Sequence, residues 1–452
     1  MGNSFLEKLR MTIGDQYVID KEEIVGRLSK DYYWYSPILE KELENKKADY
    51  IVSPTTEEDL IKVLQVAVQE RVPVTIRGGG TGNYGQAVPL TGGLLIDMSQ
   101  LNKVIEIGDD YARVQAGVRL KDLEKNLHSA NRELTIYPST YAKATIGGFV
   151  SGGSGGIGSV TWGNLWDGNV HSAKIITTED PIKVIDVCGD ELMNYIHSYG
   201  TTGIMTEVTV PIKHKSDWMQ KIYGFRSLND ALQFSQEIAE GGEWKKRLVS
   251  VVEAPISKFF IPLKRHLSDS NLNLVLIEID EGMELSLNQE AVKYNGAILY
   301  SRTAEMYRQG IGISDFTWNH TTLWAIKYDN NWTYLQNLFL KNELYWQVDQ
   351  IKKEFGDEVL LHFEWIRSKG ELKPSALPLV KFQSKERIYE IIDFFGSIGV
   401  STNNPHTYLL GAGGWNMQLE AIAKRKKVND PYNLLNQGKL PNEKLIREFT
   451  NQ

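Results

Sequence analysis

The sequence predicts an α+β protein made of two or three domains. Its 452 residues are too many for one ordinary core, because a domain holds roughly 150 residues. In the first half, short runs rich in β-branched residues alternate with amphipathic helical patterns, and the composition changes after the strand-like stretch 204–212. We therefore expect a domain boundary near Lys215.

The elements of the first half can be placed in order. We expect the first 45 residues to form a helical segment, with the charged run Glu40 to Lys47 as a solvated helix face or a linker. A helix is predicted to begin at Thr55, because Thr55 and Glu58 fit a capping box and apolar residues recur on one face of 60–68. Strands and a further helix surround it, the strands at 50–52, 72–76, 93–97 and 112–118 and the helix at 120–127.

The second half again mixes strands with helices, without an internal repeat. The strands are predicted at 248–252, 272–279 and 359–365, and the helices at 228–239 and 388–395. The chain is expected to finish with a helix near 417–427 and a loop at 430–440.

Composition excludes several classes of function. With 42% hydrophobic residues, 24% charged residues and a net charge of −7, the chain has the make-up of a soluble globular protein and no electrostatic basis for binding nucleic acid. No apolar stretch approaches the roughly 20 residues of a transmembrane helix. Cys188 is the only cysteine, which excludes a disulfide within the chain and suggests the cytoplasm. We interpret Cys188 as a buried small apolar residue.

Two glycine-rich segments carry the strongest functional signal. The segment RGGGTGNYGQ, 77–86, follows a predicted strand, so its backbone N–H groups can converge on an anion such as pyrophosphate. Gly80, Gly82 and Gly85 match G-x-G-x-x-G, but Pro89 and two further glycines prevent the long helix that this fingerprint requires. A P-loop is also excluded, because Gln86 stands where its lysine belongs.

The second glycine-rich segment is 147–163, where eight of seventeen residues are glycine. That density disfavours both a helix and the interior of a sheet. Apolar residues such as Phe149, Ile157 and Trp162 punctuate it, which is unlike a flexible linker. The sequence therefore predicts an ordered binding loop.

Four motifs in order resemble the vanillyl-alcohol oxidase and p-cresol methylhydroxylase (PCMH) superfamily of flavoproteins. They are RGGGT with a following Gly-Gln pair, YPSTYAKATIGGFVSGGSGG, YGTTGIMTEVTVPI and DPYNLLNQGKL. The resemblance covers 46–215 and 428–441. It implies a PCMH-type FAD-binding module of two subdomains at 46–215, an antiparallel-sheet cap domain with helices on one face at 216–410, and a C-terminal segment, 411–452, that returns to the FAD module. It also implies that the flavin lies where the two domains meet.

Carried over position by position, the resemblance implies a set of FAD contacts. Those around the pyrophosphate are Arg77, Gly78, Gly79, Gly80, Thr81, Gly82, Asn83 and Gln86. Those along the pyrophosphate and the isoalloxazine are Pro138, Ser139, Thr145, Ile146, Gly147, Gly148, Ser151 and Gly152, and Ile204 lies at the adenine end. Some members of the superfamily tether the flavin through a His or a Cys in these loops. Neither residue occurs there in this chain, so we expect noncovalent FAD.

Three clusters in the second half embed polar residues in apolar or aromatic runs, and each contains one histidine. They are FTWNHTTLWAIKY, LLHFEWIR and STNNPHTYLLGAGG, with His320, His362 and His406. Histidine titrates in the range that suits a general base. His362 and Glu364 are two residues apart in a predicted strand, so both side chains are expected on one face. Arg367, Lys327 and Arg302 are candidates for binding a carboxylate, or else form surface ion pairs.

The order of these clusters is similar to that of the glycolate oxidase and D-lactate dehydrogenase branch of the superfamily. This resemblance implies oxidation of a hydroxyl-bearing small molecule, a 2-hydroxy acid above all, with His406 or His320 as the base. The branch's metal-binding histidine motif is replaced here by LLHFEWIRSKGE, so no metal is expected, and an ion held by His362, Glu364 and His406 stays the alternative. Oxidation of sugars, alditols or phenolic alcohols, and a degenerate flavin-binding protein, stay open, as does the electron acceptor: oxygen, a quinone or a carrier protein.

Overall fold

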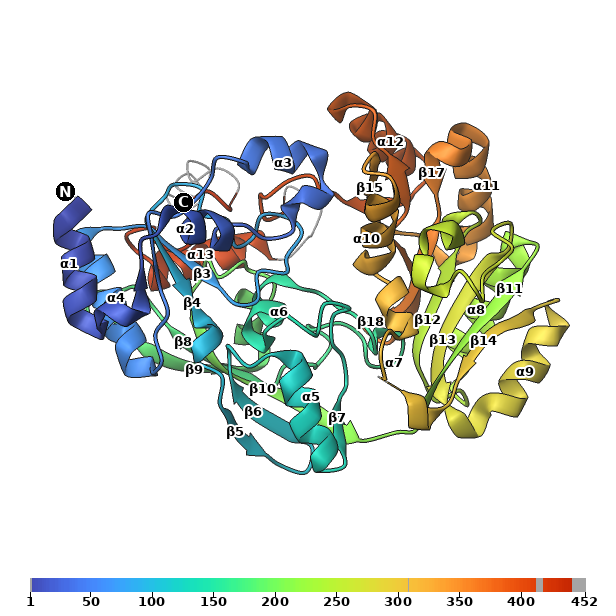
Figure 1. Ribbon diagram of the computed structural model, residues 1–452, viewed down its shortest axis with the longest axis horizontal. Coiled ribbons are helices and arrows are strands. Elements are labelled where there is room, and N and C mark those ends of the chain that lie inside the picture. The colour runs from blue at the N-terminus through green and yellow to red at the C-terminus, as the bar shows by residue number, and fades with distance from the viewer. Residues whose placement is uncertain (1, 308, 412–417, 441–452) are drawn as a thin grey trace. The chain divides into compact units, whose positions relative to one another are not determined.

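The computed structural model describes residues 2–307, 309–411 and 418–440, and the chain divides into two compact units (Figure 1). The first unit contains Met1–Ser154, Gly168–His214 and His406–Gln452. The second contains Gly155–Asp167 and Lys215–Pro405. No helix in the described ranges is both long and apolar enough to cross a bilayer.

A four-stranded sheet forms one part of the first unit. Its order is β1 (Val18–Ile19), β2 (Tyr50–Val52), β4 (Leu94–Asp97) and β3 (Val74–Arg77), with β2, β4 and β3 parallel and β1 antiparallel. Helices α1 (Gly2–Ile13) and α4 (Glu57–Glu70) share its apolar cluster, and two shorter helices are α2 (Glu22–Leu28) and α3 (Pro37–Leu43). The predicted capping residue of α4 was wrong by one position. The Thr56 hydroxyl accepts the Asp59 N–H at 3.1 Å, whereas the Thr55 hydroxyl bonds to the Asp59 carboxylate.

An antiparallel six-stranded sheet forms the other part of the first unit. Its strands are β5 (Val104–Ile107), β6 (Tyr111–Gln115), β10 (Ile204–His214), β8 (Ser172–Ile176) and β9 (Val184–Cys188), with β7 (Arg132–Leu134) also paired to β10. Helix α5 (Leu120–Ser129) packs beside β7. The predicted burial of Cys188 was wrong: this residue is exposed, because it ends β9 at the edge of the sheet.

The glycine-rich segment contains a helix, α6 (Ile146–Gly152), contrary to the prediction from glycine density. The Thr145 hydroxyl caps it by accepting the Gly148 N–H at 3.3 Å. Gly147 is required by packing, since a Cβ there would lie 2.5 Å from the Ala116 Cβ. The glycines of α6 thus allow a close approach to its neighbours.

The later part of the same segment, Gly155–Asp167, belongs to the second unit. It contains the one-turn helix α7 (Ser159–Trp162). The Thr161 hydroxyl donates to the Lys246 carbonyl at 2.7 Å, and the Gly158 N–H donates to the Arg247 carbonyl at 2.8 Å. These bonds fasten it to the second unit's own sheet.

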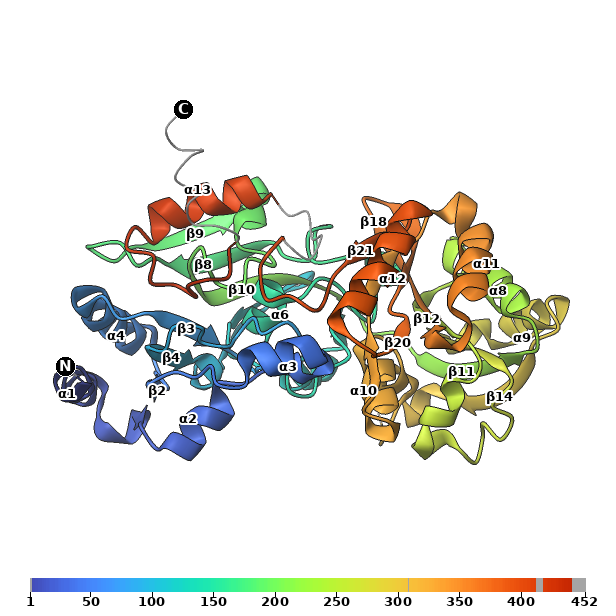
Figure 2. The ribbon, with the colours of Figure 1, turned by 90° about the horizontal axis from the view of Figure 1, so that it is seen from above.

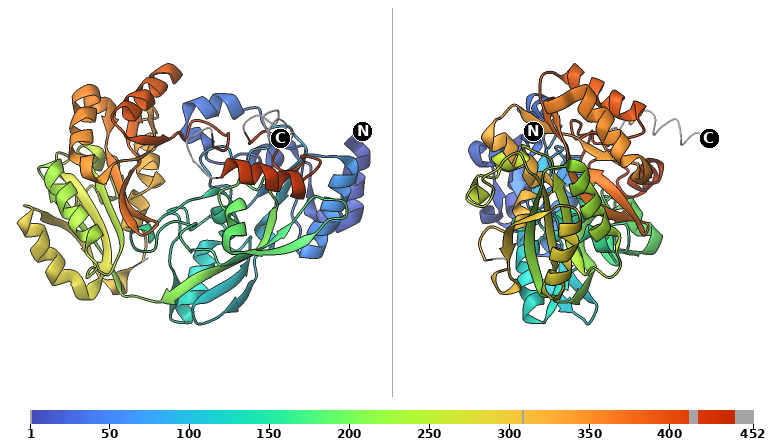
Figure 3. Two further views of the ribbon diagram at one scale, coloured as in Figure 1. Left: turned by 180° about the vertical axis from the view of Figure 1, so that it is seen from behind. Right: turned by 90° about the vertical axis from the view of Figure 1, so that its right-hand side faces the viewer.

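The C-terminal part of the chain closes the first unit. Helix α13 (Leu419–Asn429) lies beside β8 and β9 (Figures 2 and 3), and Met417, where the helix was predicted to begin, lies outside the described residues. After it, the Val74 N–H of β3 donates to the Leu434 carbonyl, and the Asn436 N–H donates to the Val74 carbonyl. The segment after α13 therefore runs along β3, immediately before the first glycine loop.

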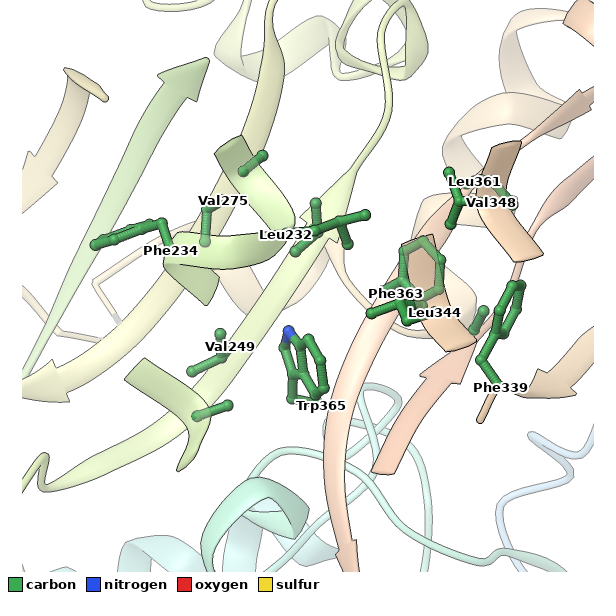
Figure 4. Packing of buried hydrophobic residues seen from close by; sticks show 14 of the residues in the cluster. Leu232, Phe234, Val249, Val275, Phe339, Leu344, Val348, Leu361, Phe363 and Trp365 are labelled. Carbon is green, nitrogen blue, oxygen red and sulfur yellow. The ribbon is translucent and has the colours of Figure 1, made fainter. Parts of the chain in front are cut away.

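The second unit is built on an antiparallel eight-stranded sheet. Its strands, in order, are β14 (Ala297–Arg302), β11 (Trp218–Phe225), β13 (Asn273–Asp280), β12 (Lys246–Val252), β18 (His362–Ser368), β19 (Glu371–Ala376), β16 (Gln336–Leu338) and β21 (Ser401–Asn403). The largest apolar cluster covers one face with α8 (Leu228–Glu240), α9 (Glu284–Lys293), α11 (Leu344–Phe355) and α12 (Lys385–Ser397). Figure 4 shows Phe363 and Trp365 of β18 in this cluster.

The opposite face of this sheet carries a second apolar cluster. It includes residues of α10 (Asn319–Tyr328) and of a small sheet in the order β15 (Trp332–Tyr334), β20 (Leu379–Lys381) and β17 (Val359–Leu360). The single strand predicted at 359–365 is divided between the two sheets, because the Leu361 N–H donates to the Glu253 carboxylate at 2.7 Å. The α+β class and the antiparallel cap are confirmed, and α10 adds a helix to the second face.

Candidate active site

The first glycine loop presents a row of unused backbone donors. In the part of the chain that the structure describes, the N–H groups of 78–83 have no hydrogen-bond acceptor. They follow β3 directly, and Gly80 has a φ of +60°, which suits glycine. Consecutive free amides in such a turn form a concave anion site.

The two glycine loops are in backbone contact within the first unit. A Cβ on Gly78 would lie 2.1 Å from the Thr145 Oγ1, and a Cβ on Gly79 would lie 2.2 Å from the Lys143 carbonyl oxygen. Side chains at these positions would separate the loops. The glycines therefore bring the free amides of the first loop next to the start of α6.

Most of the other predicted cofactor residues hold the loops together. Gln86 Nε2 donates to the Gly152 carbonyl at 2.9 Å, and the Ser151 carbonyl accepts the Tyr199 N–H at 2.9 Å. The N–H groups of Ile146 and Gly147 are taken by the carbonyls of Val118 and Ala116, so they are not free for phosphate.

The remaining predicted cofactor residues have roles in packing and turns. Arg77 Nη1 donates to the Lys30 carbonyl at 2.8 Å. The Pro138 carbonyl accepts the Tyr141 N–H, and Ser139 is buried in the same turn. Ile204 begins β10 with its side chain in the core, which leaves only its backbone for a ligand.

A buried polar pair lies on the α10 face of the second unit's sheet. His362 Nε2 lies 2.8 Å from Glu364 Oε1, and both side chains are almost fully buried. The prediction that they share one face of a strand is confirmed. Val252 and Ser250 of β12 stand opposite His362 and Glu364, which places the Ser250 hydroxyl 3.3 Å from His362 Nε2.

The hydrogen bonds of Glu364 fix the tautomer of His362. Glu364 Oε1 also accepts the Trp318 N–H at 2.6 Å, so this oxygen acts as an acceptor and the imidazole proton lies on Nε2. The lone pair is then on Nδ1. Among the described residues, neither His362 Nδ1 nor Glu364 Oε2 has a hydrogen-bond partner, although both atoms are buried. Buried polar atoms of this kind call for a ligand or a catalytic role.

Trp318 holds an unusual backbone conformation at this pair. Its φ of 52° and ψ of −142° are rare for a bulky side chain. The bond from its N–H to Glu364 maintains this conformation at the start of α10. Strain of this kind concentrates at functional sites.

No hydrogen bond between the other predicted catalytic side chains and this pair occurs in the described residues. In α10, burial and the charge of Lys327 lower the pKa of His320 to about 4, while Lys327 itself lies over the Trp324 ring. Arg367 points to the opposite face of β18 and donates to the carbonyls of Gly370 and Glu240. His406 belongs to the first unit.

Two further predicted side chains have local partners. His406 Nδ1 lies 2.7 Å from the Ser36 hydroxyl, and both residues are buried. Arg302 donates to the carbonyls of Gln309 and Ile311. No group of three or more His, Cys, Asp or Glu side chains suited to a metal ion occurs in the described ranges.

Comparison with known proteins decides the nature of the first unit's loops. A family model described as an FAD binding domain matches residues 48–183. These residues form an FAD-binding domain. The resemblance inferred from the four motifs is confirmed, and the free amides of 78–83 fit the pyrophosphate of FAD.

Curated relatives match about two fifths of the chain. An uncharacterised FAD-linked oxidoreductase of Mycobacterium tuberculosis is 33% identical over 180 residues, 38% of this chain and 39% of that protein. The glycolate oxidase subunit GlcD of Bacillus subtilis is 27% identical over 199 residues, 42% of each chain. A D-lactate dehydrogenase of Anaerostipes hadrus is 29% identical over 176 residues, 37% of this chain and 36% of that one. The chain spans about two fifths of the length of these relatives.

Likeness to solved structures extends beyond the FAD-binding domain. A structure of alkyldihydroxyacetonephosphate synthase matches with a TM-score of 0.76 and 17% identity, covering 97% of this chain and 85% of that one. At this identity the shared property is the fold. The folds of both units are therefore shared with that synthase.

Sequence reasoning missed Ser250, Trp318 and Thr321 around the histidine. The Thr321 hydroxyl lies 3.4 Å from His362 Nε2 and donates to the Phe316 carbonyl. Only the pairing register of β12 with β18 and the start of α10 bring these residues together. No spacing in the sequence signals that arrangement.

Proposed function

We propose that this chain is an FAD-dependent oxidoreductase that oxidises a hydroxyl-bearing small molecule, a 2-hydroxy acid of the glycolate or D-lactate type. The observation that carries the proposal is the buried pair His362 and Glu364, with Nδ1 of the imidazole unpartnered among the described residues. The FAD-binding domain supplies the redox group, and the pair supplies a base.

The names of the relatives support the substrate class. Glycolate and D-lactate, named for two of the relatives, both carry a hydroxyl beside a carboxylate. Because these alignments cover about two fifths of each protein, the substrate is carried over only as part of this proposal.

The proposed chemistry assigns one role to each side chain. FAD, when bound, would supply the acceptor for the hydride that leaves the carbon bearing the hydroxyl. His362 Nδ1 takes the hydroxyl proton, and Glu364 keeps the imidazole in the required tautomer and stabilises the imidazolium. Trp318 in turn orients Glu364 through its N–H. This assignment replaces His406 and His320 as preferred base, since His406 Nδ1 already lies 2.7 Å from the Ser36 hydroxyl and a pKa of about 4 makes His320 a weak base.

The FAD is proposed to be noncovalent. The two loops contain no His or Cys that could form a bond to the flavin. Acid precipitation of the flavoprotein is therefore expected to release its yellow colour into the supernatant. Colour that stays with the protein pellet would contradict noncovalent binding.

The test of the proposed function is anaerobic mixing of the FAD-loaded protein with single candidate substrates. We expect the flavin absorbance to bleach with one enantiomer of a 2-hydroxy acid. Bleaching only by sugars, alditols or phenolic alcohols would overturn the substrate class, and no bleaching by any of them would indicate a flavin-binding protein without this activity. Reoxidation with oxygen or with a quinone then identifies the electron acceptor.

A further inference from the structure

The carbonyl side of the first glycine loop is held by residues outside the matched domain 48–183. The Tyr32 N–H donates to the Gly82 carbonyl at 2.7 Å. From the other end of the chain, Lys439 Nζ donates to the Gly85 carbonyl at 2.5 Å, and Asn436 Nδ2 donates to the Gln86 carbonyl at 2.8 Å. Three carbonyls of the loop are therefore fixed by the N-terminal and C-terminal segments.

Asp31 holds the far end of the loop. Its side chain is buried, and Oδ2 accepts the Ala87 N–H at 3.2 Å while Oδ1 accepts the Tyr33 N–H at 3.0 Å. One carboxylate thus ties the end of the loop to the N-terminal segment. Arg77, just before the loop, donates to the Lys30 carbonyl, so both ends of the loop are fastened to 30–33.

Asp31 and Lys439 are both buried and carry opposite charges when ionised. Burial raises the pKa of Asp31 to about 6 and lowers the pKa of Lys439 to about 7, and each charge opposes the shift of the other. Arg77 also favours the charged form of Asp31, and the Tyr408 ring lies beside the Lys439 ammonium. Burial above all, with a smaller contribution from the charge of Asp31, raises the pKa of Tyr33 and of Tyr199.

We propose that Asp31 and Lys439 are both positioning residues for the cofactor, each through its own bond to the first glycine loop. They fix the carbonyls and the final N–H of the first glycine loop so that the N–H groups of 78–83 stay directed at the pyrophosphate of FAD. The inference rests on the assignment of this loop to FAD. It makes high-affinity binding a property of three segments of the chain and not of 48–183 alone.

The two opposite charges predict a specific pattern of mutational effects. Removing one charge leaves the other buried and uncompensated, whereas removing both relieves that cost. In D31N the amide nitrogen cannot accept the Ala87 or Tyr33 N–H, and in K439M the Gly85 carbonyl loses its donor. Each single variant is expected to raise the dissociation constant for FAD about tenfold. The increase in the double variant is expected to be smaller than the product of the two single increases.

The experiment titrates the apoprotein of each variant with FAD and follows the quenching of flavin fluorescence. Apoprotein melting temperatures are measured in parallel. The matched control is E253Q, because Glu253 is also a buried carboxylate that accepts a backbone N–H and pairs with a lysine, Lys352, but lies in the second unit. E253Q is expected to lower the melting temperature and leave the FAD Kd unchanged.

Each possible result supports or overturns the positioning role of Asp31 and Lys439. Single variants that melt earlier but bind FAD as tightly as the unchanged chain would overturn it, since Asp31 and Lys439 would then be merely structural. Where a single variant does not fold, the double variant and K439R replace it, with K439R expected to bind more tightly than K439M. An unchanged chain that binds no FAD would overturn the FAD assignment itself, whereas normal binding with unaffected variants would overturn only this inference.

Discussion

The first glycine loop and the cluster around His362 build their sites from different atoms. The loop uses backbone N–H groups, which glycines at 78–80 and 82 leave exposed and close to a second loop. The cluster uses side chains from β12, β18 and α10, which meet only because strand pairing sets Ser250 opposite Glu364. A site built from backbone N–H groups can be recognised in the sequence by its glycine pattern, whereas a site built from side chains of distant strands has almost no recognisable sequence pattern.

The largest expected effect concerns the backbone site. In G79A the new Cβ would lie 2.2 Å from the Lys143 carbonyl oxygen and push the two loops apart. We expect the purified protein to contain no FAD and to bind none on titration, as measured by absorbance at the flavin bands.

G26A is the matched control for that substitution. Gly26 lies in α2 of the same unit, and a Cβ there would meet no atom within 4 Å. Alanine also favours a helix by roughly 0.5–1 kcal/mol over glycine. G26A is expected to keep full FAD content, and a loss of flavin in both variants would show that the loop contact is not the reason.

A smaller effect is expected at the side-chain site. E364Q keeps the size of the side chain but removes the charge that stabilises the imidazolium of His362. The rate of flavin reduction by substrate is expected to fall about 10²-fold with FAD content unchanged. R367Q, in the same strand but on its opposite face, is expected to change that rate by less than about threefold, since Arg367 donates to the carbonyls of Gly370 and Glu240, away from the His362 pair. Equal losses in both variants would remove the distinction between the two faces of β18.

The smallest expected effect is the loss of stability on acidification that one buried histidine in each unit causes. Burial lowers the pKa of His197 in the first unit and of His320 in the second to about 4, below the ordinary value near 6.5. Each neutral histidine therefore contributes stability above pH 6.5 that is lost as the pH falls towards 4. Between pH 6.5 and 5.5 the loss is about 1 kcal/mol for each.

Flavin release on acidification separates these contributions. His197 Nδ1 bonds to the Gly153 carbonyl, directly after α6, so H197Q is expected to move the pH of flavin release downward. H320Q is expected to leave it unchanged, because His320 lies in the second unit. A shift with H320Q alone would reverse this assignment.

The sequence predicted most of the fold where one pattern dominates. The apolar face of α4 and the β-rich runs at β2 and β4 appear within a few residues of their predicted bounds. Helix α6 was missed because its glycines serve close packing on Ala116, which no propensity captures. Helix α10 was missed because polar residues such as Thr321 face inward, which hides its apolar side.

The candidate site was predictable to a similar degree. The glycine loops predicted an anion site, and the spacing of His362 and Glu364 predicted that their side chains share one face of a strand. The remaining contacts depend on long-range register, as with Ser250, or on a helix start that the pattern does not show, as with Trp318. Asp31 and Lys439, at opposite ends of the chain, give no joint signal in the sequence.

The most direct test of the central claim compares the unchanged protein with H362Q, both fully loaded with FAD, in anaerobic rapid mixing with a 2-hydroxy acid. The account predicts fast bleaching of the flavin in the unchanged protein and a rate about 10² to 10⁴ times lower in H362Q, with the same flavin spectrum before mixing. Bleaching at an equal rate in both proteins would contradict the role of His362 as the base.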